Sequence, residues 1–169
     1  QGRGVQGTAT QQDGPSASLT APNGTSQQRL LKAISAPPRT ISLEAHGTGT
    51  ALGDPIEIGA ASRALRTADG RLVQCSSLKS NMGHLETAAA AAGCACNIAI
   101  PLSASIVPLN IQLRRLNAHV ASCVSIEDDC LQLPTDSNGQ VASDGRVSSF
   151  GFSGTIAHGA YEGELEEDP

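Results

Sequence analysis

Two histidines stand in segments of small and polar residues that suit a shared reaction site. His46 lies in Glu-Ala-His-Gly-Thr-Gly-Thr at 44–50, and His84 lies in Lys-Ser-Asn-Met-Gly-His-Leu-Glu at 79–86. A neutral imidazole can donate a hydrogen bond to an oxygen that gains negative charge, or move a proton near neutral pH. The glycines allow a ligand to approach the backbone closely. We expect the two imidazoles to converge on one small carbonyl substrate.

The residues around the histidines suggest supporting roles. Lys79 would disfavour protonation of a nearby imidazole and keep it a neutral donor, and Glu86 could hold the lysine in place. Thr48 and Thr50 offer two hydroxyls on the same side of an extended segment. The alternatives are a structural histidine in a Gly-Thr turn and, around His84, an exposed lysine and glutamate beside a helix-capping residue.

A third segment, Ser-Phe-Gly-Phe-Ser-Gly-Thr at 149–155, combines glycines with aromatic rings. Such a segment suits a tight loop whose amide N–H groups point into a cavity, where they would stabilise an oxyanion. Phe150 and Phe152 would then form a wall or a gate beside Gly154. The alternative is a core hairpin with a bulge.

The composition bounds the class of protein. The chain of 169 residues is long enough for one domain with a core. A net charge of -5, no basic stripe and 2% aromatic residues argue against nucleic-acid binding. No apolar stretch reaches the ~20 residues of a membrane span. The five cysteines lack the spacing of zinc or redox sites, so we expect no metal and interpret them as small buried hydrophobes.

The elements that position these residues follow from periodicity and turn signals. Residues 1–25 are interpreted as a loop-rich segment of the same domain, 26–162 as its folded body, and 163–169 as a frayed acidic tail. Helices are expected at 27–34 after a Ser26 cap, at 54–66 with Glu57 as a capping-box acid, and at 85–100. Strands are expected at 41–45, 72–78, 106–109, 124–126 and 131–133, with a hairpin of 146–152 and 157–162. This pattern predicts an α/β layered fold with both histidines at the carboxyl ends of strands.

The segments 44–54, 79–86 and 149–155 resemble the two histidine motifs and the Gly-Phe-Gly-rich loop of β-ketoacyl synthases. The likeness is strongest to the ketosynthase domains of modular, type I polyketide synthases, and it runs in family order from about residue 11 to 158. It implies a thiolase-like fold, of which this chain is the C-terminal half of the αβαβα layers. The implied catalytic residues are His46, His84 and Lys79, with Glu86 in support. The implied substrate-binding residues are Thr48, Thr50, Asn81, Phe150, Phe152 and Gly154, with Phe152 at the gating position.

The resemblance also implies an activity and partners. The complete enzyme would be an acyltransferase that condenses an acyl thioester with a malonyl-type extender by decarboxylative Claisen chemistry, in polyketide or fatty acid biosynthesis. No cofactor would bind directly, because the substrate is carried on the phosphopantetheine of acyl carrier protein. The implied partners are that carrier protein, the missing N-terminal ketosynthase half, and a second copy in a homodimer of complete domains. A cytoplasmic location is expected, with the plastid as the alternative.

The chain departs from the family pattern at the nucleophile. No cysteine lies in an Ala-Cys-Ser-Ser context, and Cys75 belongs to the strand leading to Lys79. We therefore expect the chain to supply both histidines but no nucleophile, and to be inactive alone. The alternative is a non-catalytic ketosynthase-like module that binds acyl-pantetheine or a partner subunit.

Overall fold

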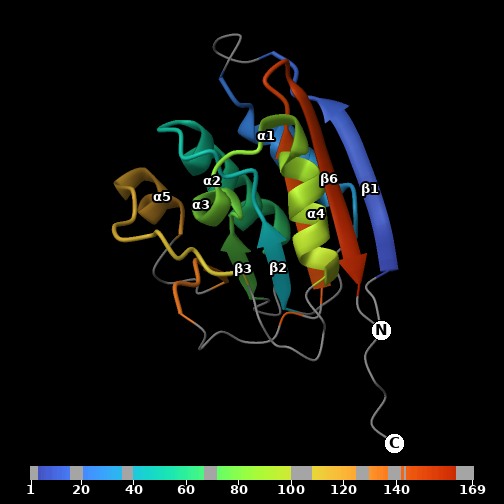
Figure 1. Cartoon of the computed structure of the whole chain (residues 1–169). Coiled ribbons are helices and arrows are strands. Elements are labelled where there is room, and N and C mark those ends of the chain that lie inside the picture. The colour runs from blue at the N-terminus through green and yellow to red at the C-terminus, as the bar shows by residue number, and fades with distance from the viewer. Residues whose placement is uncertain are drawn as a thin grey trace, which may run out of the picture.

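The computed structural model describes residues 4–15, 21–35, 40–66, 72–99, 108–124, 130–136, 142 and 144–162. Within them the chain forms one six-stranded sheet in the order β1-β6-β5-β2-β3-β4 (Figure 1). The strands are β1 (Gly4–Gln12), β2 (Ile41–Glu44), β3 (Val73–Ser76), β4 (Leu131–Gln132), β5 (Asp144–Phe150) and β6 (Thr155–Glu162). The helices are α1 (Gly24–Lys32), α2 (Gly53–Leu65), α3 (Lys79–Met82), the 3-10 turn η1 (Glu86–Ala88), α4 (Ala89–Ala99) and α5 (Ala118–Cys123). None of the helices described is long and apolar enough to cross a membrane.

The sheet is mixed, and its parallel part carries the two histidine motifs. β2 pairs in parallel with β3 on one side and with β5 on the other, and β4 adds to β3 in parallel. β6 pairs antiparallel with both β5 and β1. Because β2 and β3 are parallel neighbours, the segments that follow them leave the sheet at the same edge.

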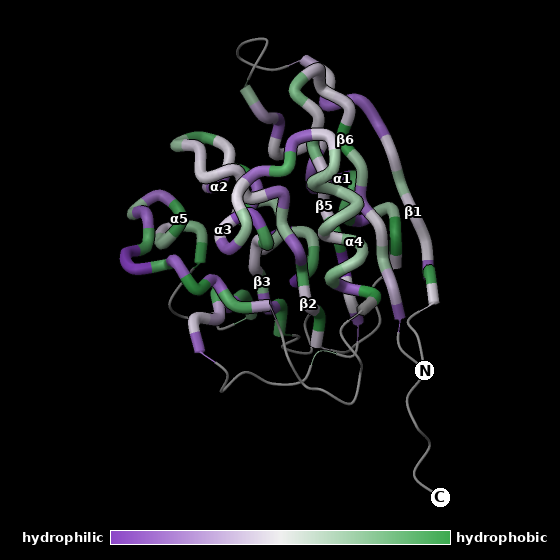
Figure 2. The backbone as a smooth tube through the Cα atoms, in the orientation of Figure 1, coloured by the Kyte–Doolittle hydropathy of each residue, from purple (hydrophilic) through white to green (hydrophobic). Residues whose placement is uncertain are grey.

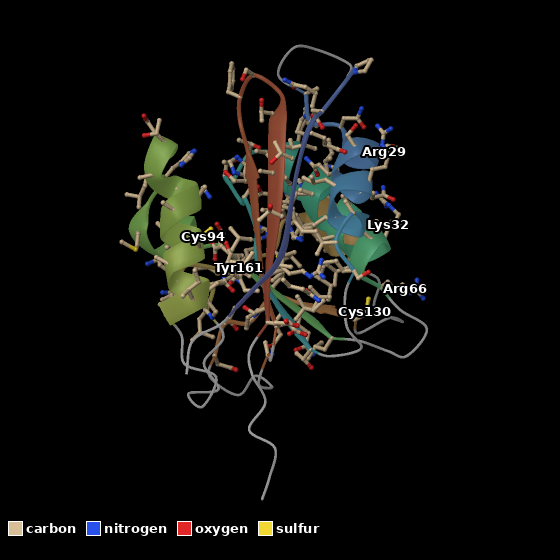
Figure 3. The ribbon with its side chains drawn as sticks, turned by 90° about the vertical axis from the view of Figure 1, so that its right-hand side faces the viewer. Arg29, Lys32, Arg66, Cys94, Cys130 and Tyr161 are labelled. Atoms are coloured by element: carbon tan, nitrogen blue, oxygen red, sulfur yellow. The ribbon has the colours of Figure 1, made fainter. Side chains whose placement is uncertain are left out.

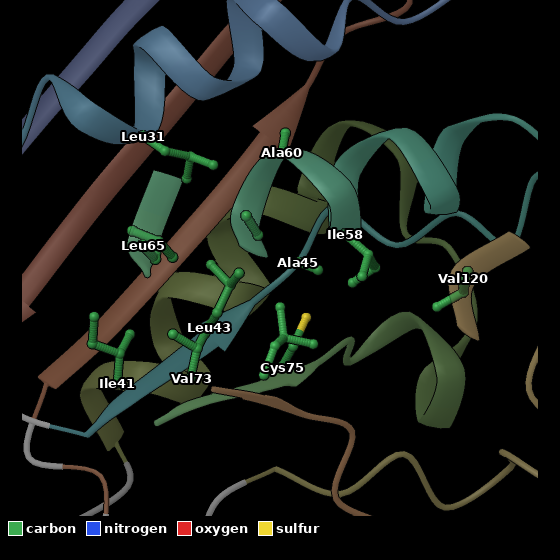
Figure 4. Close-up of a cluster of buried hydrophobic side chains, with 12 residues drawn as sticks. Leu31, Ile41, Leu43, Ala45, Ile58, Ala60, Leu65, Val73, Cys75 and Val120 are labelled. Atoms are coloured by element: carbon green, nitrogen blue, oxygen red, sulfur yellow. The ribbon is translucent and has the colours of Figure 1, made fainter. Parts of the chain in front are cut away.

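Helices cover both faces of the sheet. α1 and α2 lie on one face and α4 lies on the other (Figure 3). Residues of β2 alternate between the two faces of the sheet. Leu43, which pairs with Cys75, belongs to the apolar core, whereas Glu44, which pairs with Ser76, lies on the opposite face. The core on the α2 side is built from buried aliphatic side chains of β2, β3 and α2, including Ile41, Leu43, Ile58, Leu65 and Val73 (Figure 4). The expected α/β layering is therefore observed.

The helix α4 is unusually poor in large side chains. Its sequence is Ala-Ala-Ala-Ala-Gly-Cys-Ala-Cys-Asn-Ile-Ala, and Figure 2 colours most of it pale to green. At Gly93 an added Cβ would lie 3.1 Å from Cγ of Glu44 and 3.3 Å from Cγ1 of Val147. The small residue therefore lets the helix approach β2 and β5 closely. On the same side, the hydroxyl of Tyr161 donates to Sγ of Cys94 at 3.0 Å (Figure 3).

The N-terminal segment corrects one expectation. Residues 1–25 were expected to form a loop, but β1 occupies Gly4–Gln12 and pairs along β6. The segment has few apolar residues, which is why its composition suggested a loop. An edge strand needs backbone hydrogen bonds to one neighbour and tolerates polar side chains, so tertiary pairing decides its structure.

Other boundaries shift for local reasons. Asn23, not Ser26, caps α1, because its side chain accepts from the N–H groups of Thr25 and Ser26. The helix expected at 85–100 is divided into η1 and α4, and a short α3 precedes them. The expected strands at 41–45, 72–78 and 131–133 and the final hairpin are present with shifted or shorter bounds. Pro108, Leu109 and Val124 are not in strands. Residues 106–107 and 125–126 and the tail at 163–169 lie outside the described residues.

Candidate functional site

The structure brings the two histidines together at the edge where β2 and β3 end. His46 lies two residues after β2, and His84 follows α3, which begins three residues after β3. The two ring centroids are 6.1 Å apart, and the ring planes are nearly perpendicular at 88°. Two imidazoles at this separation can both reach one carbonyl-sized group. The expected convergence is therefore observed.

A buried carboxylate holds the backbone beside His46. Glu57 of α2 is 5% exposed, and its two oxygens accept from the N–H groups of His46 at 2.7 Å and Gly47 at 2.9 Å. Its expected role as a capping-box acid is wrong, since α2 begins at Gly53 with no side-chain cap. Asp54, the second residue of the same helix, accepts from the N–H of Gly49 at 3.1 Å. Both acids of α2 therefore shape the loop that carries His46.

Gly47 connects this loop to the strand that leads to Lys79. Its φ is 45°, and an added Cβ would lie 2.6 Å from Cβ of Ser77. The hydroxyl of Ser77 donates to the carbonyl oxygen of Gly47 at 3.3 Å. A side chain at position 47 would therefore clash as well as strain the backbone, so this contact requires glycine.

Backbone donors fix the tautomers of both histidines. Nδ1 of His46 accepts from the N–H of Phe150 at 3.4 Å, and Nδ1 of His84 accepts from the N–H of Glu86 at 3.1 Å. A neutral imidazole has one N–H and one acceptor nitrogen. With Nδ1 accepting, the proton of each neutral ring is on Nε2. Both rings then carry an Nε2–H donor for a substrate oxygen.

The electrostatic environment keeps His46 neutral. The pKa of His46 is lowered to about 4, chiefly by burial and then by the electrostatic effects of Lys79 and His84. Burial also lowers the pKa of Lys79, while the carboxylates of Glu44 and Glu57 act to raise it. The expected effect of Lys79 on an imidazole is thus seen at His46.

The carboxylates that act on Lys79 differ from the expected one. Glu86 was expected to hold the lysine, but its side chain is exposed, and the acids that stabilise the ammonium are Glu44 and Glu57. The backbone of Glu86 has a φ of 49° and donates to His84. Its contribution to the site is therefore made through its N–H group.

Proton binding by the histidines provides the first testable prediction. His46 is expected to remain a neutral Nε2–H tautomer at pH 7 and down to about pH 5, since its pKa is near 4. Lys79→Met should raise the pKa of His46 by removing a positive charge. Nitrogen-15 NMR of the imidazoles measures both. A His46 that is already protonated at pH 6 would contradict this assignment.

The residues expected to bind substrate near the histidines are partly engaged in loop contacts. Thr48 and Thr50 have their hydroxyl oxygens 3.5 Å apart, and Oγ1 of Thr50 accepts from the N–H of Gly53 at 3.1 Å. Asn81 is exposed, and its amide donates to the carbonyl oxygen of Leu109 at 2.9 Å. The two threonine hydroxyls thus lie close together, although Gly49 between them has a φ of 73° and the segment is not extended as expected. Asn81 anchors the segment after residue 107.

The loop between β5 and β6 lies against His46. The ring of Phe150 is 5.4 Å from the ring of His46, and Phe152 is 84% exposed. Gly154 has a φ of 91°, and its N–H donates to the carbonyl oxygen of Gly151 at 3.0 Å. The N–H of Gly151 in turn donates to Thr155 at 2.7 Å. These two amides are therefore used within the turn and are not free to bind an oxyanion.

The cysteine nearest to a nucleophile motif is chemically protected. Cys75 is 1% exposed, and burial together with the nearby acids Glu57 and Glu44 raises the pKa of its thiol. A thiol in this environment does not form the thiolate that nucleophilic attack requires. This agrees with the expectation that Cys75 is an ordinary buried residue.

Acyl transfer to the chain tests that conclusion. Incubation of the 169-residue chain with a labelled acyl thioester is expected to leave Cys75 unmodified, because its thiol is both buried and protonated. Intact-mass analysis and peptide mapping measure the result, with the four partly exposed cysteines as references. Stoichiometric acylation of Cys75 would show that the chain has its own nucleophile.

Three supporting residues were not identified from the sequence in the roles seen here. Glu57 and Glu44 bind backbone N–H groups on both sides of the site, and Asn110 connects the end of β3 to the segment after residue 107. The side chain of Asn110 donates to the carbonyl oxygen of Cys75 at 3.0 Å and accepts from the N–H of Ser77 at 3.3 Å. These contacts join residues at least ten positions apart, so local spacing contains no signal for them. No group of three or more potential metal ligands is found in the described part of the chain.

Comparison with known proteins agrees with the geometry. Residues 4–114 match the family model described as the C-terminal domain of β-ketoacyl synthase. The chain is 40% identical over 164 residues to a phenolphthiocerol/phthiocerol polyketide synthase of Mycobacterium tuberculosis, covering 91% of the chain and 7% of that protein. It is 36% identical over 162 residues to an erythronolide synthase of Saccharopolyspora erythraea, covering 91% of the chain and 4% of that protein.

Solved structures show the same architecture. The ketosynthase from module 1 of the bacillaene synthase of Bacillus amyloliquefaciens is 28% identical and superimposes with a TM-score of 0.80, over 96% of this chain and 32% of that one. An oxazolomycin ketosynthase domain from a Streptomyces albus strain is 26% identical with a TM-score of 0.80, over 98% of this chain and 31% of that one. The chain thus spans about a third of these ketosynthases, and the expected thiolase-like fold class is confirmed.

Proposed function

The chain belongs to the β-ketoacyl synthase family, and from this premise we propose that it supplies the two-histidine half of a polyketide-type ketosynthase site. The observation that carries the proposal is the pair of imidazoles 6.1 Å apart, both with Nδ1 accepting from a backbone N–H. The reaction class is decarboxylative Claisen condensation, and His46 and His84 are the catalytic residues. Lys79 assists them by disfavouring protonation of His46.

The chemistry follows from the two Nε2–H donors. The malonyl thioester loses CO2 when the bond between its α-carbon and its carboxylate breaks, and the electron pair moves toward the thioester oxygen. Two hydrogen-bond donors directed at that oxygen stabilise the enolate that forms. The enolate carbon then attacks the acyl thioester, and the cysteine thiolate leaves. The neutral state of His46 suits this step, because a positively charged imidazole would attract the malonyl carboxylate and oppose its departure as CO2.

The nucleophile and the carrier come from outside this chain. The buried thiol of Cys75 cannot hold the acyl group, so we propose that a cysteine from another segment of the complete enzyme does. The acyl and malonyl groups would arrive on the phosphopantetheine of acyl carrier protein, and Thr48 and Thr50 lie beside His46 where that arm would enter. Association of complete domains into a homodimer belongs to the same proposal.

A chimeric enzyme tests the proposal. The aligned third of the ketosynthase from module 6 of the bacillaene synthase of Bacillus subtilis, 29% identical and with a TM-score of 0.77, is replaced by this chain. The chimera is expected to release CO2 from malonyl carrier protein, since both histidines are supplied by the replacement. The parent ketosynthase serves as the positive control. A chimera that folds and binds carrier protein but releases no CO2 would reject the catalytic proposal.

The alternative function is a non-catalytic ketosynthase-like module that binds acyl-pantetheine or a partner subunit. The observation that favours it is the absence of an activated thiol at Cys75. The same chimera separates the two functions, because binding without CO2 release is the result expected from a binding module.

A further inference from the structure

Glu44 is a buried acid that the proposed chemistry does not use. It is the last residue of β2, lies two positions before His46, and is 3% exposed. Burial raises its pKa to about 7, while the N–H of Leu78 and the charge of Lys79 act in the opposite direction. A carboxyl group in this environment is costly unless it has partners, so its contacts indicate what it does.

One oxygen of Glu44 binds the segment that carries Lys79. Oε1 accepts from the N–H of Leu78 at 2.7 Å, and Lys79 follows as the first residue of α3. The carboxylate also acts to raise the pKa of Lys79. Glu44 thus fixes the backbone immediately before the lysine and stabilises its positive charge.

The opposite layer leaves room for this side chain. Gly93 of α4 faces Glu44, and a Cβ at position 93 would lie 3.1 Å from Cγ of Glu44. That distance is shorter than ordinary van der Waals contact, so a larger residue would displace the glutamate or the helix. The small residue in α4 therefore fits the side chain of Glu44 in β2, although the two positions are about fifty residues apart in the sequence.

Glu44 also belongs to a row of buried polar residues, so a simpler interpretation is that its carboxyl group only contributes to packing between the sheet and α4. By register, β2 and β3 place Ser42, Glu44, Gln74 and Ser76 on the face toward α4. All four are buried, and each has at least one polar side-chain atom without a hydrogen-bond partner in the described part of the structure. Only Glu44 among them accepts a hydrogen bond from the segment before Lys79. The rest of the row provides matched controls.

The charged and titratable groups around Glu44 come from several elements. They are Lys79 of α3, Cys75 of β3 and Cys96 of α4. Of these, Lys79 is the group whose charge favours ionised Glu44. The two groups therefore stabilise one another.

We propose that Glu44 is a positioning residue of the two-histidine site, which holds Lys79 in place and charged and is accommodated by Gly93. It acts on the histidines through Lys79, whose ammonium keeps the imidazole of His46 neutral. The inference rests on the proposed function for the role of the histidines, but its test reads the charge of Lys79 in the 169-residue chain itself.

Competitive amine acetylation measures this charge. The chain holds two lysines, Lys32 and Lys79, and Lys32 is exposed on α1, where it points away from the sheet (Figure 3). The Lys79 to Lys32 rate ratio is followed against pH by mass spectrometry. Glu44→Gln is expected to move the Lys79 curve to lower pH by about one unit, a roughly tenfold higher ratio near pH 8. Changed exposure alone would alter the rate equally at every pH.

Control variants decide between positioning and packing. Ser42→Ala removes a buried polar group from the same row and should leave the Lys79 curve unchanged. Gly93→Ala should shift it in the direction of Glu44→Gln, and it replaces that variant if Glu44→Gln does not fold. Coincident curves for the wild type and the folded variant would overturn the proposal, as would an equal shift in Ser42→Ala.

The acetylation experiment and the chimera experiment can fail independently of one another. A shifted Lys79 curve with an inactive chimera supports the coupling of Glu44 to Lys79 and rejects the proposed reaction. An active chimera with coincident curves supports the reaction and rejects the role of Glu44.

Discussion

Alanine at His46 or at His84 is expected to slow CO2 release by the chimeric ketosynthase by about 10²–10³-fold, the loss seen when one donor to a developing oxyanion is removed. Each ring offers one Nε2–H, because each Nδ1 already accepts from a backbone N–H. The donors act on charge that develops only in the transition state, so kcat should fall much more than KM rises. Rapid-quench assay of labelled CO2 measures the rate.

A third histidine provides the matched control for these substitutions. His119 lies exposed on α5 and has no contact with the two-histidine site among the hydrogen bonds and ring contacts described. His119→Ala should therefore retain the parental rate. Full activity in His84→Ala would remove that ring from the mechanism, and the geometric pairing of the two imidazoles would then need a structural explanation.

The convergence of the two histidines was predictable because it follows from the arrangement of the strands that precede them. Apolar runs before His46 and Lys79 predict strands, and parallel neighbours end at one edge of a sheet. The structure has β2 and β3 in that arrangement, with the imidazoles 6.1 Å apart. Family resemblance added the pairing of the two motifs, which spacing alone leaves open.

The supporting contacts were not predictable, because each joins residues that only the tertiary structure brings together. Glu57 has the local spacing of a capping-box acid, yet it turns back to bind the loop after β2. Glu86 lies near Lys79 in sequence, yet the acids that stabilise the lysine come from β2 and α2. Local spacing describes neighbours along a helix, whereas a buried carboxylate is placed by the packing of layers.

The N-terminal strand was missed for a different reason. β1 has hardly any apolar side chains, and Val5 is 65% exposed, so no hydrophobic period indicates a strand. What forms it is an unpaired row of backbone groups on β6. Such a row is a property of the completed sheet, and the sequence of the strand that fills it is only weakly constrained.

Glu57→Ala is expected to lower the free energy of unfolding by about 3 kcal/mol at pH 5. Two backbone N–H groups lose their acceptor, and a cavity is left on the buried face of α2. The loss should be smaller at pH 7. Burial raises the pKa of Glu57 from 4.5 to about 7, so the folded state holds a proton there that the unfolded state releases. Wild-type stability from this group therefore falls as pH rises from about 4.5 to 7, and the Ala variant lacks that dependence.

Urea unfolding of the wild type and Glu57→Ala at pH 5 and pH 7 measures this difference. Glu86→Ala removes an exposed carboxylate from the other histidine segment and should change stability by no more than about 0.5 kcal/mol at either pH. Destabilisation by Glu57→Ala that grows from pH 5 to pH 7 would reverse the expected sign. It would mean that the ionised carboxylate, held by the N–H groups of His46 and Gly47, is the favoured state in the folded protein. The loop of His46 would then be fixed by a charge rather than by a neutral acid.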